Sequence, residues 1–119
     1  MGSLHDGHSQ LIKEAKISKG SKASSVLVSI FINPLQFGPS EDFETYPRDL
    51  EKDCEIAFKS GADVIWAPSF EEVFPGGIKS HFQLKVPANL TKHLCGANRP
   101  NHFDGVATVI VRLLSIIKP

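Results

Sequence analysis

Cysteine, unbalanced charge and long apolar runs are all scarce in this chain of 119 residues. The two cysteines, Cys54 and Cys95, lie far apart and outside any redox or metal-binding motif, so we expect buried thiols in a reducing, cytoplasmic setting. Thirteen basic residues balance thirteen acidic ones, and no basic run predicts a nucleic-acid partner. No apolar stretch is long enough to span a bilayer, and no targeting segment is visible, so we expect no membrane partner.

The hydrophobic pattern predicts one α/β domain of modest size, with a doubly wound parallel sheet. Residues 25–32 and 63–67 are β-rich apolar runs, and the first is typical of a strand buried on both faces. Helical spacing of apolar residues predicts three helices, from about Ser9 to Gly20, from Leu50 to Gly61, and from about Gly105 to Lys118. Strand, helix and strand in this order predict a right-handed crossover.

Two shorter patterns lie between the second strand and the last helix. Residues 81–86 alternate between apolar and polar side chains, which favours an edge or terminal strand. Pro87 then suits the start of a short helix over residues 88–94.

Two histidines, His5 and His8, bracket Gly7 directly before the first predicted helix. A helix N-terminus carries partial positive charge and unsatisfied backbone donors, so it binds phosphate well. Gly7 lets a nucleotide approach the backbone, and an imidazole there donates a proton or stabilises charge on a phosphoryl group. We interpret the motif as a nucleotide site. On the pattern alone, two surface histidines or half of a metal site remain open alternatives.

Two loops are candidates for ligand binding: the first follows a predicted strand, where parallel sheets bind ligands beyond the carboxyl ends, and the second directly precedes the last predicted helix. The loop Asn33-Pro-Leu-Gln-Phe-Gly-Pro39 carries the amides of Asn33 and Gln36, which suit a small hydroxy acid; the alternative is an ordinary proline-rich turn. The loop from Cys95 to Gly105 holds Arg99 and His102, which either face an anion or belong to a plain loop. Residues 41–48 are charged and favour a structural role before the second helix.

Three blocks carry a close resemblance to a known family: M-G-x-L-H-x-G-H, then S-I-F-I-N-P-L-Q-F-G-P-x-E-D-F-x-x-Y-P-R, then C-G-A-x-R-P-x-H-F-D-G-V. Their order and spacing resemble pantothenate synthetase (pantoate–β-alanine ligase) from residue 1 to residue 119. The resemblance implies a Rossmann-like fold of the nucleotidylyltransferase superfamily. It also implies an ATP- and Mg²⁺-dependent ligase of coenzyme A biosynthesis, in which pantoate becomes pantoyl adenylate and β-alanine then displaces AMP to give pantothenate.

The resemblance also assigns roles to individual residues. The ATP-contacting stretch is the N-terminal motif: Met1, Gly2, Ser3, Leu4, His5, Asp6, Gly7 and His8. His8 resembles the proton-donating catalytic histidine of the family, with His5 as its partner against the phosphates. The expected pantoate and β-alanine contacts are Gln36, Asn33, His102, Val106 and Val109. Mg²⁺ is expected to travel with the ATP phosphates, and its protein ligands are unknown.

The family pattern extends beyond both ends of this chain. Relatives have a strand before the histidine motif, and beyond position 119 they carry further ATP-binding residues and a C-terminal domain. We therefore expect residues 1–119 to form a partial N-terminal nucleotide-binding domain that lacks the first strand, with little or no activity alone and a homodimer in the full-length form. Another H-x-G-H nucleotidylyltransferase and a non-catalytic nucleotide-binding module are the alternatives.

Overall fold

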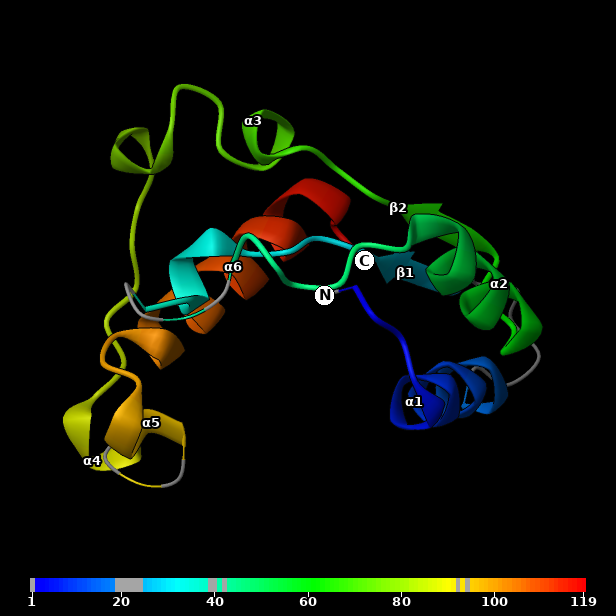
Figure 1. Cartoon of the computed structure of the whole chain (residues 1–119). Coiled ribbons are helices and arrows are strands. Elements are labelled where there is room, and N and C mark those ends of the chain that lie inside the picture. The colour runs from blue at the N-terminus through cyan, green and yellow to red at the C-terminus, as the bar shows by residue number, and fades with distance from the viewer. Residues whose placement is uncertain (1, 19–24, 39–40, 42, 92, 94) are drawn as a thin grey trace. The chain divides into compact units, whose positions relative to one another are not determined.

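The computed structural model describes residues 2–18, 25–38, 41, 43–91, 93 and 95–119 (Figure 1). These residues form two compact units, each built from two segments of the chain. Unit 1 comprises residues 1–32 and 47–68, and unit 2 comprises residues 33–46 and 69–119. Each unit is described by itself.

Unit 1 is the parallel α/β layer that the sequence predicts. It contains α1 (Asp6–Ile17), β1 (Leu27–Ser29), α2 (Leu50–Lys59) and β2 (Val64–Trp66), and helices flank the two strands (Figure 1). The strands pair in parallel, with Leu27 opposite Val64. Both strands are shorter than the apolar runs that predict them, although the amide of Ile30 still donates to the carbonyl oxygen of Trp66 at 2.9 Å.

The core of unit 1 is formed by small and branched apolar side chains from the helices and strand flanks: Leu4, Ile12, Val26, Ala57 and Ala62. Val28 and Ile65 pack against this core. The prediction that the first strand is buried on both faces is wrong, because Leu27 is 37% exposed and its partner Val64 is 43% exposed. Successive side chains of a strand point to opposite faces, and only one face of this pair meets the core.

Both helices of unit 1 begin at side-chain caps. α1 begins at Asp6, three residues before the predicted start, because His5 caps it. Asp49 caps α2 by accepting from the amide of Lys52 at 3.0 Å. Gly61 follows α2 with a φ of +105°, as expected of a glycine that ends a helix. Gly20, the predicted end of the first helix, lies outside the described residues.

Unit 2 is built around its last helix. Its elements are η1 (Pro34–Gln36), α3 (Phe70–Val73), η2 (Ile78–Ser80), α4 (Ala88–Thr91), α5 (Cys95–Asn98) and α6 (His102–Ile117). The side chains of Val73 and Phe74 are fully buried, and Arg112 of α6 donates from Nε to the carbonyl oxygen of Val73 at 2.7 Å. α6 begins three residues before the predicted Gly105. The described helices include none that is long and apolar enough to cross a membrane.

The strand predicted over residues 81–86 does not form. Two amides of this extended segment bond to side chains of α6: Leu84 to Oγ1 of Thr108 at 2.9 Å, and Val86 to Oδ1 of Asp104 at 2.8 Å. The amides of this segment therefore bond to side chains of a helix and not to a neighbouring strand. α4 confirms the first half of the predicted helix over 88–94, whereas residues 92 and 94 are outside the described part.

Candidate functional site

The N-terminal motif forms a closed hydrogen-bonded cap on α1. The amide of Gly7 donates to Nδ1 of His5 at 3.1 Å, and the amide of His5 donates to Nδ1 of His8 at 3.3 Å. The two rings lie 4.1 Å apart between centroids. Because a backbone N–H only donates, both Nδ1 atoms carry a lone pair in this network. Each neutral imidazole therefore has its proton on Nε2, at the far side of the ring from the helix.

The electrostatics around His8 favour its neutral ring. Burial lowers the pKa of His8, and the neighbouring His5 lowers that pKa further, while Asp53 opposes the shift. At neutral pH, His8 is therefore an Nε2–H hydrogen-bond donor at a helix N-terminus and carries no charge. This arrangement suits the recognition of an anionic oxygen.

Gly7 is required by the histidines themselves. A Cβ atom at this position would lie 2.9 Å from Cε1 and 3.2 Å from Nδ1 of His5. The sequence suggests that this glycine admits a nucleotide to the backbone. The structure shows that the imidazole of His5 already occupies the space beside it.

Asp53 positions the N-terminal motif, a role that the sequence did not predict. Its side chain is 2% exposed, and it accepts from the amides of Ser3 at 2.8 Å and Leu4 at 2.6 Å. Ser3 has a φ of +57°, so these two bonds hold a left-handed turn immediately before the histidines. One signal in the sequence could have indicated this role. Asp53 lies four positions before Ala57, on the buried face of α2, and a buried carboxylate needs hydrogen-bond partners.

In unit 2, Asn33 has a structural role that the sequence did not predict. Its side chain is 1% exposed, Nδ2 donates to the carbonyl oxygen of Gly105 at 3.1 Å, and Oδ1 accepts from the amide of Leu35 at 3.2 Å. Gly105 lies directly under η1, because a Cβ atom there would overlap the carbonyl of Leu35 and would lie 2.9 Å from the amide nitrogen of Gln36. Asn33 thus fixes the loop on α6.

Arg99 and His102 contact the same loop. Nδ1 of His102 lies 2.8 Å from the carbonyl oxygen of Gln36, and Nη2 of Arg99 donates to that oxygen at 3.3 Å. Nε of Arg99 lies 2.5 Å from Oε1 of Glu41. Of the two interpretations left open for Arg99, an external anion or a role within the loop, the ion pair with Glu41 favours the role within the loop.

The predicted site residues divide between the two units. Unit 1 brings His5 and His8 together with the turn formed by Gly2, Ser3 and Leu4, and Asp6 is the first, exposed residue of α1. In unit 2, Asn33, Gln36 and His102 lie where the loop containing η1 meets α6. Val106 is half-buried and Val109 is 6% exposed, both on α6. Met1 lies outside the described residues.

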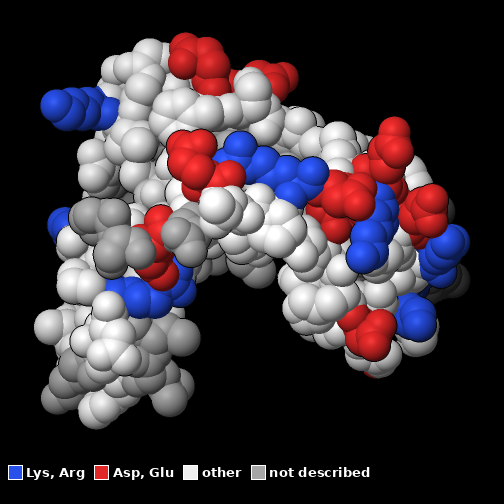
Figure 2. Space-filling model, in the orientation of Figure 1, with Lys and Arg blue, Asp and Glu red and all other residues white. Residues whose placement is uncertain are grey.

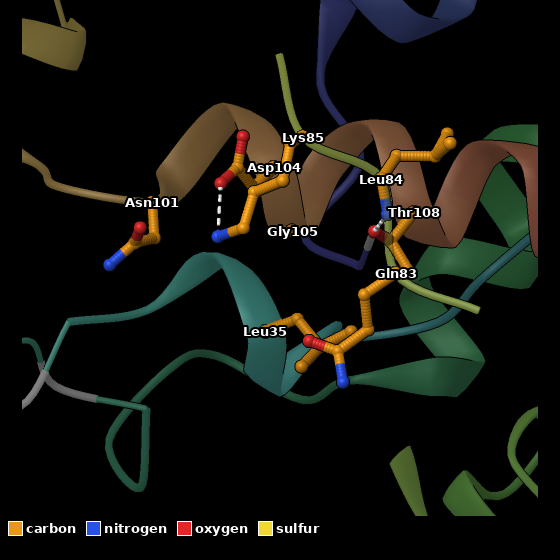
Figure 3. A pocket seen from close by; sticks show the side chains of 8 residues that line it. All are labelled: Leu35, Gln83, Leu84, Lys85, Asn101, Asp104, Gly105 and Thr108. Carbon is orange, nitrogen blue, oxygen red and sulfur yellow. Dashed lines mark hydrogen bonds and ion pairs between the residues drawn. The ribbon is translucent and has the colours of Figure 1, made fainter. Parts of the chain in front are cut away.

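A cavity of about 300 Å³ lies in unit 2 beside α6 (Figure 3). The ion pair between Nζ of Lys85 and Oδ2 of Asp104, 2.8 Å long, lies on its wall. The lining consists of Leu35, Gln83, Leu84, Lys85, Asn101, Asp104, Gly105 and Thr108. Neither Gln36 nor His102 belongs to this lining, so the cavity is distinct from the predicted acid contacts.

Two further properties of the described residues bear on metals and charge. No group of three or more His, Cys, Asp or Glu side chains in these ranges is arranged to hold a metal ion. On the face shown in Figure 2, basic and acidic side chains are interspersed.

The family model described as pantoate-beta-alanine ligase matches residues 1–119. The chain belongs to the pantoate-beta-alanine ligase family. It is 60% identical over 119 residues to a bifunctional pantoate ligase/cytidylate kinase of Prochlorococcus marinus and 52% identical to one of a Synechococcus species. Each match covers all of this chain and 24% of the relative, so the chain spans about a quarter of the length of these ligase relatives.

Solved structures of pantoate-beta-alanine ligases share the fold. The pantothenate synthetase of Thermus thermophilus superposes with a TM-score of 0.87 at 44% identity, over 100% of this chain and 41% of that chain. The ligase of Francisella tularensis, complexed with beta-gamma ATP and β-alanine, superposes with a TM-score of 0.85 at 40% identity, over 100% of this chain and 43% of that chain. These matches confirm the predicted Rossmann-like α/β fold.

Proposed function

We propose that this chain supplies the nucleotide-binding and acid-binding part of an ATP-dependent ligase that joins pantoate to β-alanine. The observation that carries the proposal is the pair of imidazole Nε2–H donors fixed at the start of α1. Membership of the ligase family supports it, and so does the Francisella tularensis relative, which is complexed with beta-gamma ATP and β-alanine.

The ATP phosphates bind at the N-terminal motif in this proposal. His5 and His8 donate from Nε2 to phosphate oxygens, and the positive end of α1 adds to the attraction. The pantoate carboxylate attacks the α-phosphorus, pyrophosphate leaves, and pantoyl adenylate forms. Because His8 is neutral, its contribution is a hydrogen bond to the charge that builds on the phosphoryl oxygens and the leaving pyrophosphate. The Nε2 proton is the one available for donation to that leaving group.

The acid substrate binds near Gln36. We assign its side-chain amide to the pantoate and β-alanine polar groups, while Asn33 holds the loop that carries it. Val106 and Val109 are assigned to the apolar wall that meets the geminal methyl groups of pantoate. His102 joins that wall with its ring face, since both of its ring nitrogens contact protein atoms. The amine of β-alanine then attacks the acyl carbon, and AMP leaves.

Mg²⁺ belongs to this proposal as a companion of ATP, where it would neutralise phosphate charge. Mg²⁺ keeps several waters and is bound largely through substrate phosphates, so the proposal needs no cluster of protein ligands. We also propose a cytoplasmic location and a homodimer for the enzyme of full family length.

Pantoate-dependent exchange of pyrophosphate into ATP tests the proposal in an enzyme of full family length that contains this sequence. His8→Ala removes one phosphate donor and is expected to slow exchange by about 10²–10³-fold. His8→Gln places an amide N–H near the position of Nε2 and is expected to retain part of the rate. The exposed His93 provides the control, and His93→Ala is expected to match the wild type. Unchanged exchange in His8→Ala would overturn the assignment.

The isolated chain of 119 residues is expected to bind ATP weakly and to release little or no AMP with pantoate and β-alanine. The reason is that it spans only 41% of the Thermus thermophilus enzyme. AMP release at a normal ligase rate from the isolated chain would contradict this expectation.

A further inference from the structure

We propose that Arg99, held by Glu41 and bonded to His102, is a positioning residue that fixes the backbone of Gln36 for acid recognition. The inference rests on the proposed function of Gln36 and adds three residues that no comparison assigns to that role. It stands on the geometry of a single network in unit 2.

All three guanidinium nitrogens of Arg99 face partners of this network, Nε through an ion pair and not a hydrogen bond. Nε faces Oε1 of Glu41 at 2.5 Å, Nη1 faces Nε2 of His102 at 3.4 Å, and Nη2 donates to the carbonyl oxygen of Gln36 at 3.3 Å. The side chain is 29% exposed, so these contacts are partly shielded from water. A guanidinium is planar and its donors have fixed directions, so one group can orient three partners at once.

The tautomer of His102 follows from its two partners. Arg99 only donates, so Nε2 of His102 accepts; the carbonyl of Gln36 only accepts, so Nδ1 of His102 donates. His102 is therefore the neutral Nδ1–H form in this network. This tautomer is opposite to that of His5 and His8.

Glu41 closes the network on the loop itself. Its Oε2 accepts from the amide of Gly38 at 2.6 Å, while Oε1 faces Arg99. The Gly38 N–H is the largest influence and lowers the pKa of Glu41; burial opposes it, and the Arg99 guanidinium lowers the pKa further. The carboxylate is therefore present at neutral pH and holds Arg99 toward the loop.

The consequence for Gln36 is a backbone fixed from two sides. Its carbonyl oxygen accepts from both His102 and Arg99, which fills both lone pairs. On the other side, the backbone of η1 rests on Gly105 without space for a Cβ atom. The backbone that carries the Gln36 side chain is thereby fixed before any ligand binds, and such preorganisation reduces the free-energy cost of ordering a binding group.

Steady-state kinetics of the full-length ligase tests this role with a matched pair of substitutions. His102→Asn places an amide N–H near the position of Nδ1, whereas His102→Gln places one near Nε2. We expect the KM for pantoate to rise about tenfold in His102→Gln and in Arg99→Met, as for loss of one hydrogen bond, with the KM for ATP unchanged. His102→Asn is expected to raise the KM for pantoate less than His102→Gln does, because both remove the ring but only asparagine keeps a donor near the position of Nδ1.

Lys85→Met is the control, because it removes an ion pair of unit 2 that does not contact Gln36. It is expected to leave the KM for pantoate unchanged. An unchanged KM for pantoate in Arg99→Met, or an equal increase in His102→Asn and His102→Gln, would overturn the positioning role.

Long-range ¹H–¹⁵N NMR spectra of the isolated chain test the network without any activity. We expect His102 to show the Nδ1–H tautomer, and Arg99→Met to lose that preference. An Nε2–H tautomer in the wild type would refute the network, whatever the enzyme does. If the Nδ1–H tautomer is found while exchange does not depend on pantoate, the network stands and the proposed function fails.

Discussion

Replacing Asp53 by asparagine tests how the histidine motif is held. The carboxylate accepts two short hydrogen bonds, from the amides of Ser3 and Leu4, at a side chain that is 2% exposed. Asparagine keeps one acceptor oxygen and turns an NH₂ group toward the second amide. One hydrogen bond to a charged group is lost and two donors face each other, which we expect to cost about 1.5–3 kcal/mol of the free energy of unfolding.

Urea unfolding of the chain measures this cost, and Asp49→Asn is the matched control. Asp49 lies on the same helix at the exposed N-cap, where asparagine caps as well as aspartate, so we expect a change of less than about 0.5 kcal/mol. Amide hydrogen exchange at Leu4 gives a local measure, with faster exchange expected in Asp53→Asn. If the two substitutions have the same effect on the urea midpoint and Leu4 exchange is unchanged, Asp53 does not hold the turn.

Three further predictions concern the same contacts. Gly105→Ala is expected to destabilise the chain by more than about 2 kcal/mol in urea, because the new Cβ would overlap the carbonyl of Leu35; a smaller loss would show that η1 moves away freely. Gly7→Ala is expected to displace the ring of His5 and weaken ATP binding in calorimetry; unchanged affinity would refute that contact. The lowered pKa of His8 favours its neutral form in the folded state, so stability is expected to fall as the pH drops below about 6.5 in the wild type. His8→Gln is expected to reduce that slope, and equal slopes would contradict the shift.

The fold was largely accessible from the sequence because its strands and helices carry strong periodic signals. The apolar runs at 25–32 and 63–67 contain β1 and β2, and helical spacing located α2 and α6. The segment 81–86 was assigned wrongly for a physical reason. Alternation reports that one face is more exposed than the other, but it does not say that the bonding partner is a side chain of α6.

The sequence predicts which motifs form the candidate site, but it does not predict the contacts between their residues. His5 and His8 were identified because imidazoles and free backbone donors at a helix start suit a phosphate, and because the motif that contains them resembles that of the ligase family. The partnership between Arg99 and Glu41 joins residues 58 positions apart, and no local pattern specifies it. The role of Asp53 could not be predicted either. A carboxylate on an apolar helix face indicates that it has a hydrogen-bond partner, but the sequence does not specify that the partner is the amide of Ser3.

An ATP titration of the isolated chain, followed through the imidazole ¹⁵N signals of His5 and His8, tests the central claim most directly. We expect both residues to show the Nε2–H tautomer before ATP is added, and both Nε2 signals to shift with a common saturation curve while those of His81 and His93 stay in place. An Nδ1–H tautomer, or a titration in which His5 and His8 do not respond, would contradict the claim that this pair of donors binds the triphosphate.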